Sequence, residues 1–193
     1  GGVGGEAGGG LPRGGGWVVA RRQGAGAVGA GGAEGAGGGG PLEGRAAEVE
    51  QKPRVVWVMG PDGDPTTQTI TRLSELLEPG DIVIDGGNTN WQLAMADAAR
   101  LKAKGMHYLD AGTSGGVWGM ENGYVLMVGG EDAIFEHCKP LLTDLASPAG
   151  GLVHTGPEGS RHFVNMSHND IVHDILRPYT EGFEVMKPTH YLP

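Results

Sequence analysis

Short apolar runs alternate along the chain with longer segments in which apolar residues recur every three or four positions. Short continuous apolar runs are typical of strands buried on both faces, and the longer period is typical of helices packed on a sheet. The pattern predicts strands at residues 55–59, 81–85, 106–110, 124–128 and 152–154. It predicts helices at residues 66–77, 91–104 and 131–145, and from about 159 to 176.

Residues that start and stop helices flank these segments. Thr66 or Thr67 can cap the first predicted helix with a hydroxyl oxygen, and Gly105 can end the second with a left-handed backbone. Pro178 lacks an N–H group and clashes with the preceding helical turn. We therefore expect Pro178 to break or kink the last helix.

The alternation of buried strands and helices of 12 to 15 residues indicates parallel βαβ units with right-handed crossovers. The predicted fold class is α/β, with a Rossmann-like doubly wound parallel sheet. In open sheets of this kind, ligands bind outside the carboxyl ends of the strands. The segments that follow the strands are therefore the first place to look for a site.

Two glycine-rich segments follow neighbouring predicted strands. Residues 86–90 read Gly-Gly-Asn-Thr-Asn, and residues 112–119 contain Thr113, Ser114, Gly115 and Gly116. Glycines let a backbone approach a ligand closely, and successive free N–H groups suit a carboxylate or a phosphate. The alternative is that both segments are plain turns, which glycine clusters commonly mark. If they are functional, they should share one edge of the sheet.

Composition divides the chain into three parts. About half of residues 1–44 are glycine, against a background of ~7%, so this part should be disordered or a degraded first βα unit. The motif Gly24-x-Gly26-x-x-Gly29 lies there, but the glycines after it oppose the helix that a dinucleotide fingerprint must open. We assign residues 45–158 to the nucleotide-binding domain and 159–193 to the first helices of a second, helical domain.

Charge and cysteine content narrow the function. The formal net charge of −9 argues against nucleic-acid binding, and no apolar run approaches the length that spans a bilayer. A cytoplasmic protein without a membrane partner is the expectation. The single cysteine, Cys138, has no partner for an internal disulfide and is interpreted as a buried structural thiol.

Several motifs occur in a fixed order between residues 45 and 184. They are Val55-Val-Trp-Val-Met59, Ile84-Asp-Gly-Gly-Asn-Thr-Asn90, Asp110-Ala-Gly-Thr-Ser-Gly-Gly-Val-Trp-Gly119, Leu126-Met-Val-Gly-Gly130, Gly156-Pro-x-Gly159 and His162-Phe-Val164 with Met166, His168 and Asn169. In this order and spacing they resemble decarboxylating 6-phosphogluconate dehydrogenase, a branch of the β-hydroxyacid dehydrogenase superfamily.

The resemblance implies a reaction and a site. The family oxidises 6-phosphogluconate at C3 with NADP or NAD and releases CO2 to give ribulose 5-phosphate, in the pentose phosphate pathway. The sequence leaves the choice between NAD and NADP open. By resemblance, the cofactor-binding residues are Met59, Gly60 and Asn88, and the substrate-binding residues are Asn88, Ser114, Gly115, Gly116, His168 and Asn169. The plainer readings are a turn for Asn88 and a polar helix pair for His168 and Asn169.

The departures from the family pattern concern proton transfer. The lysine that acts as general base in the family is Asn165 here, and the glutamate that acts as general acid is Val172. An amide has no pKa suited to proton abstraction near neutrality, and each such group contributes about 10²–10⁴ in rate. Asp170, His173 and Asp174 point away from the direction of Asn165 on a helix, so no catalytic residue is intact.

Two expectations about assembly follow from the resemblance. The family continues into a large helical domain that completes the substrate site and a homodimer, whereas this chain ends at Pro193, so we expect a truncated and impaired enzyme for which dimerisation is doubtful. The alternative is a non-catalytic fragment that binds a nucleotide or sugar phosphate, or pairs with an intact homologue. No metal site is expected, because His168 and His173 lie on different faces of a helix.

Overall fold

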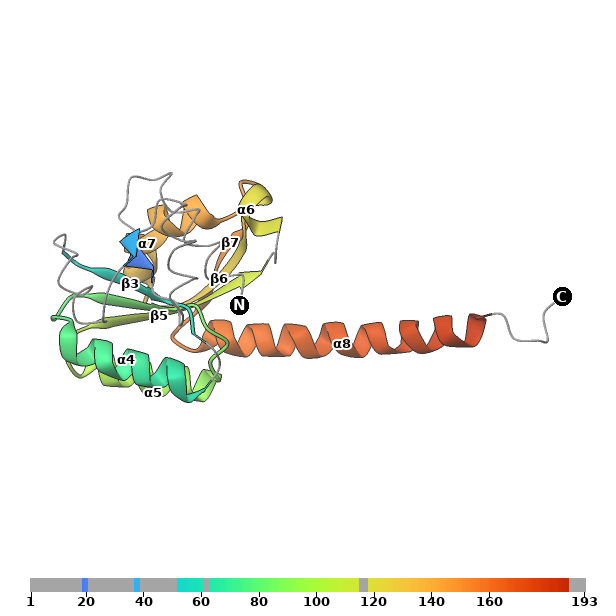
Figure 1. Cartoon of the computed structure of the whole chain (residues 1–193), viewed down its shortest axis with the longest axis horizontal. Coiled ribbons are helices and arrows are strands. Elements are labelled where there is room, and N and C mark those ends of the chain that lie inside the picture. Colours follow the sequence, from blue (N-terminus) through green and yellow to red (C-terminus); the bar gives the residue numbers. More distant parts are fainter. Residues whose placement is uncertain (1–18, 21–36, 39–51, 61–62, 115–117, 188–193) are drawn as a thin grey trace.

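The computed structural model describes residues 19–20, 37–38, 52–60, 63–114 and 118–187. Its body is a five-stranded sheet with helices on both faces, and one long helix leaves that body (Figure 1). The strands are β3 (Val55–Val58), β4 (Ile82–Asp85), β5 (His107–Ser114), β6 (Val125–Gly130) and β7 (Leu152–Gly156). The helices are α4 (Asp64–Leu76), α5 (Trp91–Lys102), α6 (Gly119–Asn122), α7 (Asp132–Leu145) and α8 (Ser160–Met186). Separately, β1 (Val19–Ala20) pairs in parallel with β2 (Gly37–Gly38).

The α/β Rossmann-like fold class is confirmed, with a correction to the strand directions. The sheet order is β3-β4-β5-β6-β7, and β3, β4 and β5 are parallel as predicted. β6 instead runs antiparallel to β5, and β7 follows the direction of β6. Only ten residues separate Ser114 from Val125, and a parallel crossover needs a dozen or more. β5 is also longer than predicted and includes Gly112-Thr-Ser114.

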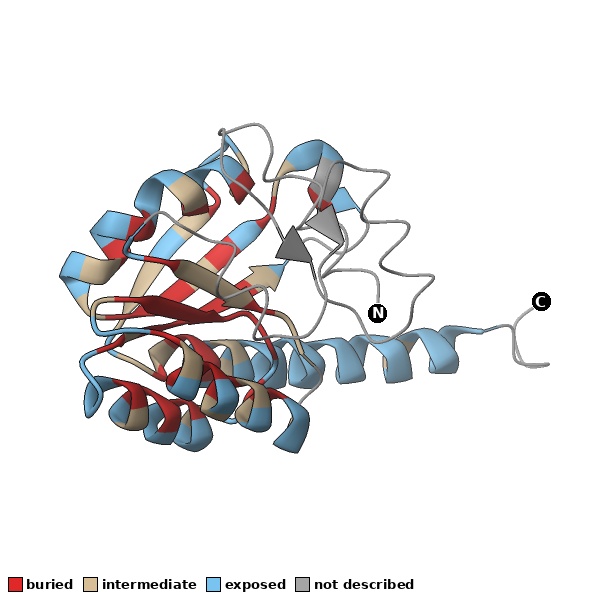
Figure 2. Ribbon diagram, turned by 60° about the vertical axis from the view of Figure 1, so that its left-hand side comes forward, coloured by how far each residue is buried: buried red, intermediate tan, exposed pale blue. Residues whose placement is uncertain are grey.

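Each face of the sheet has its own hydrophobic core (Figure 2). Successive side chains of a strand point to opposite faces, so Val83 packs with α4 and α5 while Ile82 and Ile84 pack with α7. Full burial of such side chains contributes roughly 1.5–3 kcal/mol each. Cys138 belongs to the α7 core, where burial raises its pKa to about 11, in agreement with a structural thiol.

The start of α4 differs from the prediction. The helix begins at Asp64 with Gly63 as its N-cap, and neither Thr66 nor Thr67 caps it. Pro65 occupies the first turn, where its missing N–H is not needed, and the Asp64 carboxylate is favoured by the helix dipole. The α5 helix has a side-chain cap, in which Asn90 Oδ1 accepts a hydrogen bond of 2.9 Å from the Gln92 N–H.

The expected break at Pro178 does not occur, because α8 continues through it to Met186. Proline removes one backbone hydrogen bond, and the carbonyl that loses its donor belongs to Asp174, an exposed residue that water can reach. Only the first turn of α8 contributes buried residues, and the rest projects away from the sheet (Figure 2). Within the described residues, no helix is both long and apolar enough to cross a membrane.

Candidate functional site

The corner after β4 is built around the buried carboxylate of Asp85. One oxygen accepts from the Gly87 N–H at 2.9 Å, and the other accepts from the Thr89 hydroxyl at 2.7 Å and the Tyr108 hydroxyl at 3.0 Å. Burial, together with the Asp85 charge, raises the pKa of Tyr108 well above its usual value, so its hydroxyl stays a donor. These bonds hold the turn that carries Asn88.

The start of α8 is held against the sheet by a second buried carboxylate, Asp110 of β5. Its oxygens accept from the Gly159 N–H at 2.9 Å and the His162 N–H at 3.2 Å. These are the donors that a helix leaves unpaired at its first turn. A Cβ at Gly129 would lie 2.5 Å from Asp110 Oδ1, so only glycine there lets the helix start come this close.

Two buried side chains join α8 to the corner after β4. Arg161 Nη1 donates to the Gly87 carbonyl at 3.0 Å, and His162 Nε2 lies 3.2 Å from the same oxygen. His162 Nδ1 lies 3.2 Å from Asp110 Oδ2 but is not aligned for a hydrogen bond. A Cβ at Gly112 would lie 2.0 Å from Arg161 Nε, so the guanidinium fills the space above a glycine of β5.

Arg161 has few electrostatic partners for a buried cation. Burial lowers its pKa, and the charges of Asp110 and Asp85 only partly oppose this effect. Its Nε is buried without a hydrogen-bond partner. Within the described residues it forms no ion pair, and Asp85 and Asp110 accept hydrogen bonds from other donors.

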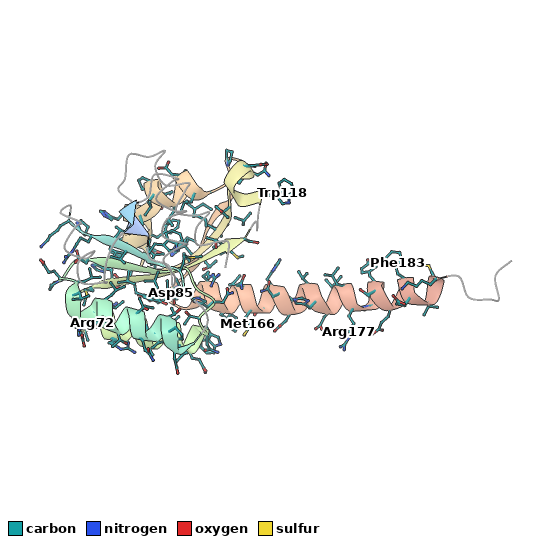
Figure 3. All side chains as sticks on the ribbon, in the orientation of Figure 1. Arg72, Asp85, Trp118, Met166, Arg177 and Phe183 are labelled. Carbon is teal, nitrogen blue, oxygen red and sulfur yellow. The ribbon has the colours of Figure 1, made fainter. Side chains whose placement is uncertain are left out.

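A pocket of about 300 Å³ opens where this corner meets α8. Figure 3 labels Asp85 near the start of α8 and Met166 on the early turns of that helix. The lining contains amides, one hydroxyl, two aromatic or thioether side chains, and the buried arginine and histidine, and it contains no carboxylate. Its residues are Asn88, Thr89, Asn90, Trp91, Arg161, His162, Asn165, Met166 and Asn169. Such a set can hydrogen-bond hydroxyls and an anion.

The structure brings together some of the predicted substrate residues. Asn88 from the corner after β4 meets Asn165 and Asn169 from α8 around the pocket. Neither His168 nor Val172 lines it, although Asn169, the neighbour of His168, does. The pair His168 and Asn169, predicted to act together, is therefore divided.

The second glycine-rich segment lies partly outside the described residues. Ser114 is the exposed last residue of β5, on the edge where β4 also ends, but it does not line the pocket. Gly115 and Gly116 lie outside the described residues. Their predicted role in substrate binding therefore stays a prediction.

The predicted cofactor residues Met59 and Gly60 follow β3 and pack beside the corner after β4. A Cβ at Gly86 would lie 2.4 Å from Met59 Sδ, and a Cβ at Gly87 would lie 3.3 Å from the Gly60 carbonyl. Met59, Gly60 and the glycines before Asn88 thus form one glycine-lined corner at the carboxyl ends of two parallel strands. This is the place in an open sheet where a nucleotide binds.

Sequence reasoning missed Arg161 and His162 as lining residues. The signal was present, because residues that share a helix face are spaced by three and four positions. Forward from Asn165, this spacing gives residues 168, 169 and 172. The same rule selects 162 and 161, one turn earlier.

Residues 28–156 match the NAD binding domain of 6-phosphogluconate dehydrogenase. The chain is 37% identical over 136 residues to the NAD(+)-dependent, decarboxylating 6-phosphogluconate dehydrogenase of Haloferax volcanii, covering 70% of this chain and 44% of that protein. It is 36% identical over 146 residues to the Bacillus subtilis enzyme of the same description, covering 74% of this chain and 31% of that protein.

The fold comparison agrees. Plasmodium falciparum 6-phosphogluconate dehydrogenase, solved in its apo form and with NADP+ or 6-phosphogluconate, superposes with a TM-score of 0.85 at 24% identity. That match covers 95% of this chain and 41% of that protein. The chain thus spans less than half the length of these relatives. On the match to its NAD-binding domain, it belongs to the 6-phosphogluconate dehydrogenase family.

Proposed function

We propose that this chain binds NAD or NADP together with a sugar acid phosphate such as 6-phosphogluconate, and that it catalyses little or no oxidation on its own. The observation that carries the proposal is the meeting of Asn88, Asn165 and Asn169 around one pocket. It lies beside the glycine-lined corner in a chain of this family. The relatives named above are 6-phosphogluconate dehydrogenases.

The residues of the corner fit the nicotinamide end of the cofactor. Gly86 and Gly87 let the end of β3 pack closely against the turn that carries Asn88, and Asn88 offers an amide that both donates and accepts. A bound nicotinamide would supply the hydride acceptor. Met59 and Gly60 would lie against the same end, since they already pack on Gly86 and Gly87.

Impaired turnover is proposed because proton transfer lacks its groups. Oxidation of a secondary alcohol requires a base to take the hydroxyl proton as hydride leaves the carbon. Asn165 is the residue at the pocket in the position of the family base, and its amide can orient a hydroxyl but not deprotonate it. Val172 offers no proton, and it does not line the pocket.

Calorimetry and an assay for reduced cofactor test the proposal on the full chain. We expect heats of binding for 6-phosphogluconate and for NAD or NADP, with no accumulation of reduced cofactor. Turnover would contradict the impaired chemistry, and absence of any binding would contradict the function. Asn165→Lys combined with Val172→Glu should not restore activity alone, because the match covers only 44% of the Haloferax volcanii enzyme and only one of these positions lines the pocket.

A non-catalytic partner of an intact homologue is the second candidate. It is favoured by the exposed apolar side chains along the projecting part of α8, which include Ile171, Ile175, Leu176, Tyr179 and Phe183. Apolar surface of this extent commonly marks a protein contact. Size-exclusion chromatography with an intact 6-phosphogluconate dehydrogenase should then give a joint peak, and separate elution would reject this candidate.

A cytoplasmic location is part of the proposal. It is supported by the metabolic relatives and by the sequence pattern described above. Fractionation of cells that express the chain tests it, and recovery in a membrane or organelle fraction would contradict it.

A further inference from the structure

The buried guanidinium of Arg161 is chemically incomplete. The residue is 3% exposed, and its one hydrogen bond goes to a neutral carbonyl, that of Gly87. A buried cation is costly unless it is paired and its hydrogens are bonded, because desolvation penalises the charge. Within the part of the chain that the structure describes, no carboxylate offsets this cost directly.

The two nearby carboxylates are committed to other donors. Asp85 accepts from Gly87, Thr89 and Tyr108, which shape the corner after β4. Asp110 accepts from the first turn of α8. Each therefore has a structural role apart from Arg161.

Arg161 keeps hydrogens for which the described residues supply no acceptor. Nη1 is bonded to Gly87, and the edge of the guanidinium formed by Nε and Nη2 lies over Gly112, whose Cβ would be 2.0 and 2.5 Å from these two atoms. The Nη2 group and the second hydrogen of Nη1 remain, and the side chain lines the pocket. A guanidinium offers paired hydrogens in a plane, which suits a carboxylate.

The pocket has a second source of positive potential. Residues 88–91, at its wall, include the N-cap and first residue of α5. The amino end of a helix carries partial positive charge and free N–H groups. No carboxylate of the described residues lines the pocket, so neither source is offset there.

We propose that Arg161 is a specificity-determining residue that binds the anionic oxygens of the ligand in this pocket, those of a carboxylate. The inference rests on the proposed function and deepens it, because it assigns the acid end of a sugar acid to Arg161. Asn88, Asn165 and Asn169 are then left for the hydroxyls. The site thereby selects hydroxy acids over neutral sugars.

Binding by the full chain tests this, with four probes that separate the possible anions. 6-Phosphogluconate carries a carboxylate and a phosphate, gluconate only the carboxylate, glucose 6-phosphate only the phosphate, and glucose neither. The variants are Arg161→Met, which keeps a long side chain without the charge, and Arg161→Lys, which keeps the charge without the paired, coplanar N–H groups of the guanidinium. Arg177→Met is the matched control, an exposed arginine on the projecting part of α8 (Figure 3).

We expect Arg161→Met to weaken gluconate and 6-phosphogluconate by roughly 10- to 100-fold, the value of a hydrogen bond to a charged group. Arg161→Lys should recover part of the loss, and Arg177→Met should change nothing. Affinity for NAD or NADP should stay as in the unaltered chain. Circular dichroism and urea unfolding establish that each variant is folded.

Each contrary result has its own meaning. Unchanged or tighter gluconate binding by folded Arg161→Met would overturn the inference, since Arg161 would then only fill space above Gly112. A loss confined to glucose 6-phosphate would overturn the carboxylate assignment in favour of a phosphate. An unaltered chain that binds NAD or NADP but no sugar acid would overturn the proposed substrate together with this inference.

Discussion

Two buried arginines lie at opposite ends of the parallel strands, Arg54 at the amino ends and Arg161 at the carboxyl ends, and they differ in how fully their charges are paired. Arg54 precedes β3, and its Nε and Nη2 lie 2.8 and 2.7 Å from Asp81 Oδ2. The Arg54 backbone N–H also donates to Asp81 Oδ1 at 2.8 Å. Arg161, near the carboxyl end of β4, has a single neutral acceptor among the residues that the structure describes. The Arg54–Asp81 pair stabilises the fold. Arg161 instead keeps N–H groups that can donate to a ligand.

The pKa values reflect this difference. Burial acts to raise the pKa of Asp81, but hydrogen bonds from Arg54 and from the Glu78 and Arg54 N–H groups outweigh it, and the pKa is lowered. For Arg161 burial prevails over the attraction of Asp110 and Asp85, and the pKa is lowered, which disfavours the charge. The charged form is stabilised for Asp81 and destabilised for Arg161.

Arg54→Met should give the largest loss of stability. It leaves Asp81 buried without its cation, and breaking a buried pair from one side typically costs about 3–5 kcal/mol. Urea unfolding of the variant beside Arg177→Met measures the effect. A loss no larger than that of the control would contradict a stabilising role for the pair.

The same pair predicts a pH dependence. Because the folded pKa of Asp81 is lowered from 3.8, the charged carboxylate contributes stability that is present above pH 3.8 and lost as pH falls through the lower folded value. In Arg54→Met this contribution should be reduced. Unfolding free energies measured from pH 7 down to pH 3 compare the two slopes, and equal slopes would show that Arg54 does not set the pKa.

Gly112→Ala should have an intermediate effect at the other end of the strands. The new methyl group would overlap Arg161 Nε, and overpacking typically costs about 1–3 kcal/mol. Adding Arg161→Ala should restore part of the stability, because the overlapping group is removed. If the double variant is as unstable as the sum of the single ones, Gly112 and Arg161 are not coupled in the way the contact requires.

Arg161→Met should give the smallest effect, within about 1 kcal/mol of the unaltered chain. The variant loses the hydrogen bond to Gly87, but it also removes a buried charge that has no ion pair, and the two effects offset each other. Thermal unfolding of Arg161→Met and Arg54→Met in the same buffer gives the contrast directly. Equal losses would remove the difference between the two arginines.

The strands and helices followed from local pattern, because apolar period and glycine or proline positions act over a few residues. Asn88, Asn165 and Asn169 were found by resemblance and do meet around the pocket. The antiparallel direction of β6 was not predicted, because it depends on the number of residues that connect β5 to β6 and not on the pattern within either strand. The continuation of α8 through Pro178 was not predicted. It is possible because water can bond to the exposed Asp174 carbonyl, which loses its N–H donor at Pro178.

Burial of charged residues was the least predictable part. Nothing near Arg161 in the sequence marks it as buried, because its burial depends on Gly112 in β5 and Gly87 after β4. Asp85 and Asp110 read as the polar ends of strands, yet each organises a turn or a helix start by accepting backbone N–H groups. Such roles appear only when distant segments are assembled.

The anchored start of α8 has a mechanical consequence. A helix of 27 residues is about 40 Å long and stiff, and the first turn of α8 is hydrogen-bonded to Asp110 and to Gly87. A displacement of the far end of α8 is therefore transmitted to that first turn. Tilting the far end pulls on the carbonyl next to Asn88. A protein domain that binds the far end of α8 would therefore also change the shape of the corner after β4.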